Sequence, residues 1–106
     1  MKAALYLGEK NIKVKEIEDP KINNDTVLLK INGCAICGSD IRTFNFGNKR
    51  VNTPKILGHE ISGVIVDKGK NVINYEVGDR ISVGADIPCN NCIYCNSNKP
   101  NNCKKN

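Results

Sequence analysis

The chain has 106 residues, of which 16 are Lys or Arg and 11 are Asp or Glu, so its formal net charge is +5. This length corresponds to one domain or part of one, with room for a modest hydrophobic core. The lysines are scattered and are not interleaved with aromatic residues, so we expect a solvated basic surface and no nucleic-acid partner. No stretch resembles a signal peptide or a transmembrane helix, and we therefore expect a cytoplasmic protein without a membrane segment.

Short strand patterns fill the first part of the chain. The apolar run at 1–7 predicts a strand, and a turn leads to a second strand in which Ile12 and Val14 alternate with lysines. That alternation is typical of a half-exposed strand. Residues 26–32 predict a third strand. A short helix is expected through 41–44, with Ser39 or Asp40 as its cap.

The second half begins with strands and ends without them. The β-branched run from Ile61 to Val66 predicts a strand that is buried on both faces, and 81–83 predict another strand. From Ala85 onward Cys, Asn and Pro dominate, so this segment has almost no core and needs a metal to hold it. The pattern predicts a mainly β fold with a short helix and a metal-stapled loop lobe.

Four cysteines in this last segment have the spacing Cys-x2-Cys-x2-Cys-x7-Cys. They are Cys89, Cys92, Cys95 and Cys103. Structural zinc fits the ligand type and the compact loop, and such a site is closed and does no chemistry. An iron–sulfur cluster is the main rival, although ferredoxins place the fourth cysteine sooner and follow it with proline. Two disulfides would require an oxidising compartment, for which the sequence gives no signal.

A second candidate metal site lies upstream. His59 is the only histidine, and a lone histidine is more often structural or solvated than a metal ligand. Here it is followed by Glu60 and flanked by glycines at 58 and 63, which allow close approach of the backbone. Cys37 precedes the predicted helix, whose positive end would favour a thiolate.

Four motifs in this order resemble the N-terminal part of the medium-chain zinc-dependent alcohol dehydrogenases. They are GCAICGSD at 33–40, GHEISGVI at 58–65, VGDRI at 77–81 and the four-cysteine segment. The resemblance spans the whole chain and is nearest to the polyol and threonine dehydrogenase branches. It implies that 1–106 form part of a GroES-like, partly open barrel, truncated here, with a structural zinc lobe at 85–104. The parent enzyme would add an α/β Rossmann domain, whose glycine-rich fingerprint is absent, so we expect a fragment.

The resemblance also implies a role for each residue of the upstream site. Cys37 and His59 would bind the catalytic zinc, and Glu60 would either be a further ligand or lie just behind the metal. Asp40 would accept a hydrogen bond from the other ring nitrogen of His59, which orients the ring. Ser39 would pass the substrate proton toward solvent.

Two neighbouring residues fall outside these roles. Cys34 belongs to neither ligand set and is expected to be a small buried residue. Arg42 stands where many relatives carry the histidine that ends the proton relay, and arginine cannot shuttle a proton in that way. It would either meet an anionic group of cofactor or substrate or face solvent.

The implied activity is oxidation of a secondary alcohol, polyol or amino-alcohol to the carbonyl, with hydride transfer to NAD(P) held by another domain. Zinc would act there as a Lewis acid with an open coordination position. The implied partners are a small alcohol substrate and further copies in a homo-oligomer, a dimer or a tetramer. The fragment alone is expected to bind zinc but to be inactive. The alternative is an iron–sulfur or zinc-stapled binding module without enzyme activity.

Overall fold

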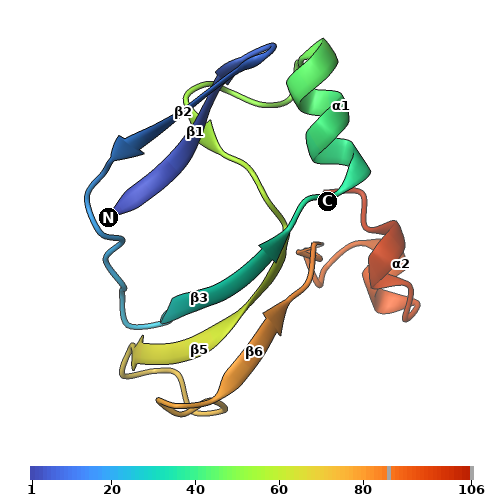
Figure 1. The fold of residues 1–106 in the computed structure, drawn as a ribbon. Coiled ribbons are helices and arrows are strands. Elements are labelled where there is room, and N and C mark those ends of the chain that lie inside the picture. The colour runs from blue at the N-terminus through green and yellow to red at the C-terminus, as the bar shows by residue number, and fades with distance from the viewer. Residues whose placement is uncertain (86, 106) are drawn as a thin grey trace.

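The strands form two antiparallel three-stranded sheets (Figure 1). The computed structural model describes residues 1–85 and 87–105. The first sheet has the order β2-β1-β4, with β1 at Lys2–Gly8, β2 at Asn11–Glu16 and β4 at Lys55–Ile56. The second sheet has the order β3-β5-β6, with β3 at Val27–Ala35, β5 at Glu60–Lys68 and β6 at Arg80–Val83. The helical elements are α1 at Gly38–Phe46, α2 at Ile93–Asn96 and the 3₁₀ turn η1 at Pro100–Asn102.

The first two strands form a hairpin in which Lys2 pairs with Glu16 and Tyr6 with Ile12. Its turn uses Lys10 in the left-handed region, with φ 54°. All six residues of β2 are exposed, and Ile12 and Val14 keep 45% and 70% of their surface. The predicted half-burial of this strand is therefore wrong. The alternation is present in the sequence, but β2 is an edge strand. Ile12 faces an open cavity that it shares with Ile41 and Phe44 of α1, so it is not packed into a core.

The second sheet is built on the long pairing of β3 with β5, which runs from Val27 opposite Lys68 to Ala35 opposite Glu60. The predicted strand over 26–32 is confirmed and extends to Ala35. The strand predicted at 61–66 is confirmed within β5, but its burial on both faces is wrong. Ile65 is fully buried, whereas Val66 is 45% exposed, because only one face of β5 meets other described residues closely.

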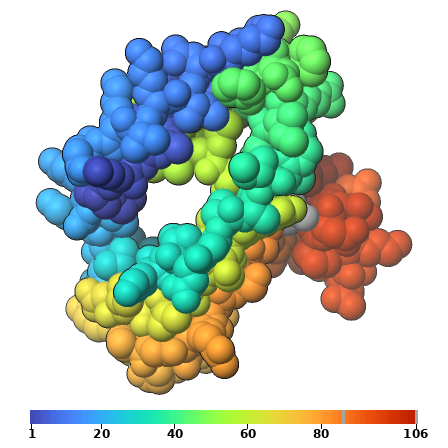
Figure 2. Space-filling model, in the orientation of Figure 1, coloured from blue at the N-terminus to red at the C-terminus, as the bar shows by residue number. Residues whose placement is uncertain are grey.

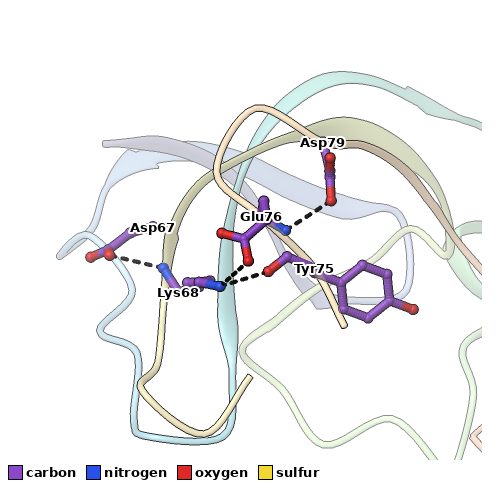
Figure 3. Close-up of polar contacts among 5 residues, drawn as sticks. All are labelled: Asp67, Lys68, Tyr75, Glu76 and Asp79. Carbon is purple, nitrogen blue, oxygen red and sulfur yellow. Dashed lines mark hydrogen bonds and ion pairs between the residues drawn. The ribbon is translucent and has the colours of Figure 1, made fainter. Parts of the chain in front are cut away.

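A polar network holds the turn between β5 and β6 (Figure 3). The Nζ ammonium of Lys68 donates to the backbone oxygen of Tyr75 at 2.9 Å and to Oε1 of Glu76 at 2.7 Å. The backbone N–H of Glu76 donates to Oδ2 of Asp79 at 2.8 Å. These hydrogen bonds stabilise the reversal of chain direction that allows β6 to pair with β5 in the second sheet.

Helix α1 begins two or three residues earlier than the sequence predicts. Its N-cap is Cys37 rather than Ser39 or Asp40. Asp40 is the third helical residue, and its Oδ2 accepts the backbone N–H of Cys37 at 2.9 Å. An acidic side chain that reaches back in this way satisfies an N–H that the helix itself leaves free. The helix contacts the first sheet through the Tyr6 hydroxyl, which donates to the Thr43 backbone oxygen at 3.1 Å.

The hydrophobic core is small. Among the described residues only Tyr6, Ile65 and Cys103 are buried apolar side chains. The two sheets lie on opposite sides of an opening that Figure 2 shows through the molecule, and the segment containing α2 and η1 projects from them as a separate lobe. This mainly β, partly open barrel is the fold class that the resemblance implies. None of the described helices is long and apolar enough to cross a membrane.

Candidate metal centres

Sheet register brings the upstream site together. Ala35, the last residue of β3, pairs with Glu60, the first residue of β5. Cys37 lies two residues beyond Ala35, and His59 immediately precedes Glu60, so both lie at the same end of the sheet. One ligand atom from each of Cys37, His59 and Glu60 lies within 4.8 Å of the others. The structure thus gathers three side chains of the types that bind zinc.

Local hydrogen bonds favour the thiolate form of Cys37. The backbone N–H of Ser39 and then its hydroxyl donate to the sulfur, and His59 adds a third interaction; together they lower the pKa of Cys37. The same contact with the Cys37 sulfur raises the pKa of His59, and the Asp40 carboxylate adds to that rise. Since the thiolate is the form that binds metals, the start of α1 prepares this sulfur for a cation.

Asp40 lies beside the imidazole ring. Its Oδ1 is 3.8 Å from Nδ1 of His59, which is longer than a hydrogen bond, while its Oδ2 holds the Cys37 backbone N–H at 2.9 Å. One carboxylate therefore contacts the segments that carry two candidate ligands. With Nδ1 next to a carboxylate, Nε2 is the nitrogen left for an ion.

A cavity of about 360 Å³ opens beside this site and is lined by Ser39, Asp40 and His59. Two cations that sequence reasoning did not single out, Arg50 and Lys55, line the same cavity. In the sequence, these two residues are simply two of many basic residues scattered along the chain. They line one cavity because the loop before β4 folds back toward α1. No local sequence pattern predicts the course of that loop.

The two neighbouring residues of uncertain role are both exposed. Arg42 lies on the exposed side of α1, as the solvent-facing alternative expects. Cys34 is also exposed, so the prediction of a buried residue is wrong. Its side chain lines a second cavity, mainly apolar and of about 390 Å³, together with Ile36 and Phe44. The sulfur of Cys34 lies against the backbone of Gly58, but the rest of the residue stays open to solvent near the end of β3.

The four downstream cysteines also converge. Their sulfurs all lie within 4.8 Å of one another. The Sγ–Sγ distances are 4.0 Å for Cys89–Cys95, 3.6 Å for Cys92–Cys95 and 4.0 Å for Cys92–Cys103. A tetrahedron of sulfurs at ~2.3 Å from zinc has edges of ~3.8 Å, so this set fits one zinc-sized ion. A cluster of several irons would hold its cysteine sulfurs farther apart.

Backbone N–H groups surround these sulfurs. Donation from Cys95 and Lys104 lowers the pKa of Cys92 to about 6. Burial, followed by the neighbouring thiols, raises the pKa of Cys95 to about 11. Four crowded sulfurs cannot all carry a negative charge without a cation among them, and an ion at their centre removes this conflict. All six cysteines are free thiols, and the two-disulfide interpretation finds no support in the described structure.

Comparisons with known proteins agree with these two sites. The family model for the alcohol dehydrogenase GroES-like domain matches residues 23–106. The chain is 39% identical over 106 residues to sorbitol dehydrogenase of Bacillus subtilis, covering 97% of this chain and 30% of that protein. It is 38% identical over 93 residues to L-threonine 3-dehydrogenase of Bacillus velezensis, covering 85% of this chain and 27% of that protein.

Solved structures give the same result. The chain superposes on CAD from Helicobacter pylori, complexed with NADP(H), with a TM-score of 0.82 and 29% identity, covering 98% of this chain and 30% of that one. The chain thus spans less than a third of the length of these relatives.

Proposed function

The chain belongs to the medium-chain zinc-dependent alcohol dehydrogenase family, and on that basis we propose that it supplies the metal-binding segment of an NAD(P)-linked enzyme that oxidises an alcohol to a carbonyl. The two relatives described above are named for sorbitol and threonine, so secondary alcohols, polyols and amino-alcohols are the proposed substrates. The front part of the GroES-like catalytic domain, with the lobe at 85–104, is the proposed identity of this segment.

One observation carries this proposal: the chain gathers two metal-ligand sets of different character. Four sulfurs would complete the coordination of one ion and would leave no position for a substrate, as in a structural zinc site. Cys37, His59 and Glu60 provide only three ligands, and a cavity opens next to them. An incomplete ligand set beside a cavity is the arrangement of catalytic zinc sites.

In the proposed mechanism, Cys37 and His59 would hold a zinc ion, and Glu60 would be a further ligand from this chain or lie just behind the metal. Zinc supplies a Lewis acid that polarises the alcohol oxygen. Asp40 fixes the His59 ring and the start of α1 through the contacts described above. Ser39 lies in the first turn of α1 and lines the cavity, where its hydroxyl can accept the alcohol proton and pass it toward solvent.

The hydride acceptor in this proposal is NAD(P), held by a nucleotide-binding domain of the enzyme. The NADP(H) complex of the Helicobacter pylori relative supports that choice. A cytoplasmic location is proposed because a reducing compartment keeps all six cysteines available as thiols. We also propose that the enzyme forms a homo-oligomer and that its substrate is a small molecule.

The test is alcohol-dependent reduction of NAD⁺ or NADP⁺ by the polypeptide that carries this chain, with sorbitol and threonine in the substrate panel. We expect Cys37→Ser and His59→Ala each to lower kcat/KM by at least ~100-fold, because they remove ligands of the reacting metal. Metal analysis should show that the four-cysteine zinc remains in both variants. Cys34→Ser is the matched control, and it should keep activity because Cys34 belongs to neither ligand set.

Two results would contradict the proposal. One is full activity in His59→Ala. The other is no alcohol-dependent reduction by protein in which both sites hold zinc, and this result would favour a zinc-stapled binding module. An iron–sulfur carrier would show itself by visible absorption and iron content.

A further inference from the structure

The cavity beside His59 has an unusual charge composition. Its polar lining residues include Ser39, Thr43, Asn48 and Asn52, together with one acidic and two basic residues. The acidic residue is Asp40, and the basic residues are Arg50 and Lys55. Positive charge therefore exceeds negative charge in this lining.

The one carboxylate is already engaged. Asp40 accepts the Cys37 backbone N–H and lies 3.8 Å from His59, so its charge is directed at the metal end of the cavity. Within the part of the chain that the structure describes, neither Arg50 nor Lys55 forms an ion pair. Two cations thus line a concave surface without a counter-charge of their own.

Both cations sit on ordered backbone. Asn48 closes a turn by accepting the Arg50 backbone N–H on its side-chain oxygen at 2.9 Å, and the Val51 N–H donates to the Asn48 backbone oxygen at 3.0 Å. Lys55 is the first residue of β4 and pairs with Tyr6 of β1. The cavity wall is therefore a fixed feature of the fold.

A zinc ion bound at the metal end would not remove the excess of positive charge in the cavity lining. The Cys37 thiolate and the Glu60 carboxylate would balance the two charges of zinc, and Asp40 would leave one net negative charge at the metal end. This single charge does not match the two positive charges of Arg50 and Lys55. Guanidinium and ammonium groups both bind phosphate and carboxylate oxygens through charge-assisted hydrogen bonds.

We propose that the substrate is an alcohol that also carries an oxyanion, a phosphate or a carboxylate, and that Arg50 and Lys55 hold this group while the hydroxyl carbon faces His59. The inference rests on the proposed function, because the metal defines the reacting end of the cavity. According to this inference, Arg50 and Lys55 determine the specificity for anionic over neutral alcohols.

The experiment uses the zinc-loaded chain labelled with ¹⁵N and four probes: glycerol 3-phosphate, glycerate, glycerol and inorganic phosphate. Binding is followed by the amide signals of Gly58 and His59, at the reacting end, and of Val51, at the cationic end. We expect the two charged alcohols to bind at least ~10-fold more tightly than glycerol, as charge-assisted hydrogen bonds would provide. The stronger of the two identifies the oxyanion as phosphate or carboxylate.

Charge-removing variants locate the effect. Arg50→Gln and Lys55→Gln should each reduce the preference for the charged alcohols ~3-fold or more, and the double variant should abolish it. Lys49→Gln is the matched control: it removes the same charge one residue away, outside the cavity lining, and should leave the preference unchanged. All three side chains are exposed, so the fold should tolerate each change.

Three outcomes would overturn the inference: binding of glycerol as tight as that of both charged alcohols, an equal loss in Lys49→Gln, or inorganic phosphate binding as tightly as the stronger of the charged alcohols. The last would show that the hydroxylated part makes no contact. Failure of the proposed function is a separate result. The preference for charged alcohols should persist in Cys37→Ser, whereas an active enzyme restricted to neutral alcohols would contradict this inference alone.

Discussion

At the scale of single residues, Gly58 controls where His59 lies. Its backbone has φ +112°, a conformation that side chains rarely adopt. A Cβ at this position would lie 2.6 Å from the Sγ of Cys34. From the sequence, this glycine is notable only as the neighbour of His59. The structure shows that a larger residue is excluded there by Cys34 on β3, and no local sequence pattern predicts that contact.

We expect Gly58→Ala to lower the free energy of unfolding by about 1–3 kcal/mol, from backbone strain and the clash with Cys34. Chemical denaturation followed by circular dichroism measures this change. Gly84→Ala is the control, because a Cβ there meets no atom within 4 Å and its φ lies outside the left-handed region. Adding Cys34→Ala to Gly58→Ala should recover the steric part of the loss. Equal stability of Gly58→Ala and Gly84→Ala would contradict the prediction.

At the scale of elements, the placement of α1 decides whether the upstream site forms. This helix carries Ser39 and Asp40, begins at Cys37 and contacts the first sheet through Tyr6. The Tyr6 side chain is 2% exposed, and its hydroxyl reaches the Thr43 backbone oxygen from a distant strand. The first hairpin is thus joined to the helix that bears the site by this buried hydrogen bond and by the Lys10 backbone N–H, which donates to the Phe44 backbone oxygen at 2.7 Å.

Replacing Tyr6 with Phe should therefore destabilise the fold by about 1 kcal/mol, the usual net contribution of a buried hydrogen bond. Hydrogen exchange should show faster opening of α1 amides than of β5 amides. Tyr75→Phe serves as the comparison, since Tyr75 is 49% exposed and forms its described bonds through the backbone. A loss no larger than that of Tyr75→Phe would mean that the Tyr6 hydroxyl does not hold the helix.

The sequence predicts most of the strands, including the short β6 at Arg80–Val83. An apolar run identifies β1, alternation identifies β3 and a β-branched run identifies β5, because each of these signals is local. The two residues of β4 carry no such pattern, and they form a strand only because β1 offers its free edge. The cap of α1 was misassigned because Asp40 acts from inside the helix, which only the path of the chain reveals.

At the scale of the whole molecule, the two sheets and the cysteine lobe depend on different forces. The sheets are joined by long antiparallel ladders, whereas the lobe contains a helix of four residues, a 3₁₀ turn of three and one buried side chain, Cys103. Such short helical segments are not stable alone. The candidate ligands could be predicted from the sequence because the cysteine spacing is local, but the cationic cavity wall could not, because it assembles from separate loops.

Removing zinc with a chelator should unfold the lobe and leave the sheets. We expect the amide signals of 89–105 to lose dispersion and exchange protection, because the ion supplies most of the stability of this segment. The amides of β3 and β5 should remain protected. Cys95→Ser should reproduce this effect and Cys34→Ser should not. Simultaneous loss of all signals would show that the lobe and the sheets unfold as one unit.

The register of β3 and β5 also implies an order of assembly. Cys89 and Cys103 are 14 positions apart, so closing the lobe around an ion requires only a short loop and no sheet. Cys37 and His59 meet only when Ala35 pairs with Glu60 across the ladder, and another register would separate the two chain segments that carry these residues. The lobe can therefore bind its ion early in folding. The upstream site can bind an ion only after β3 and β5 have paired in the correct register.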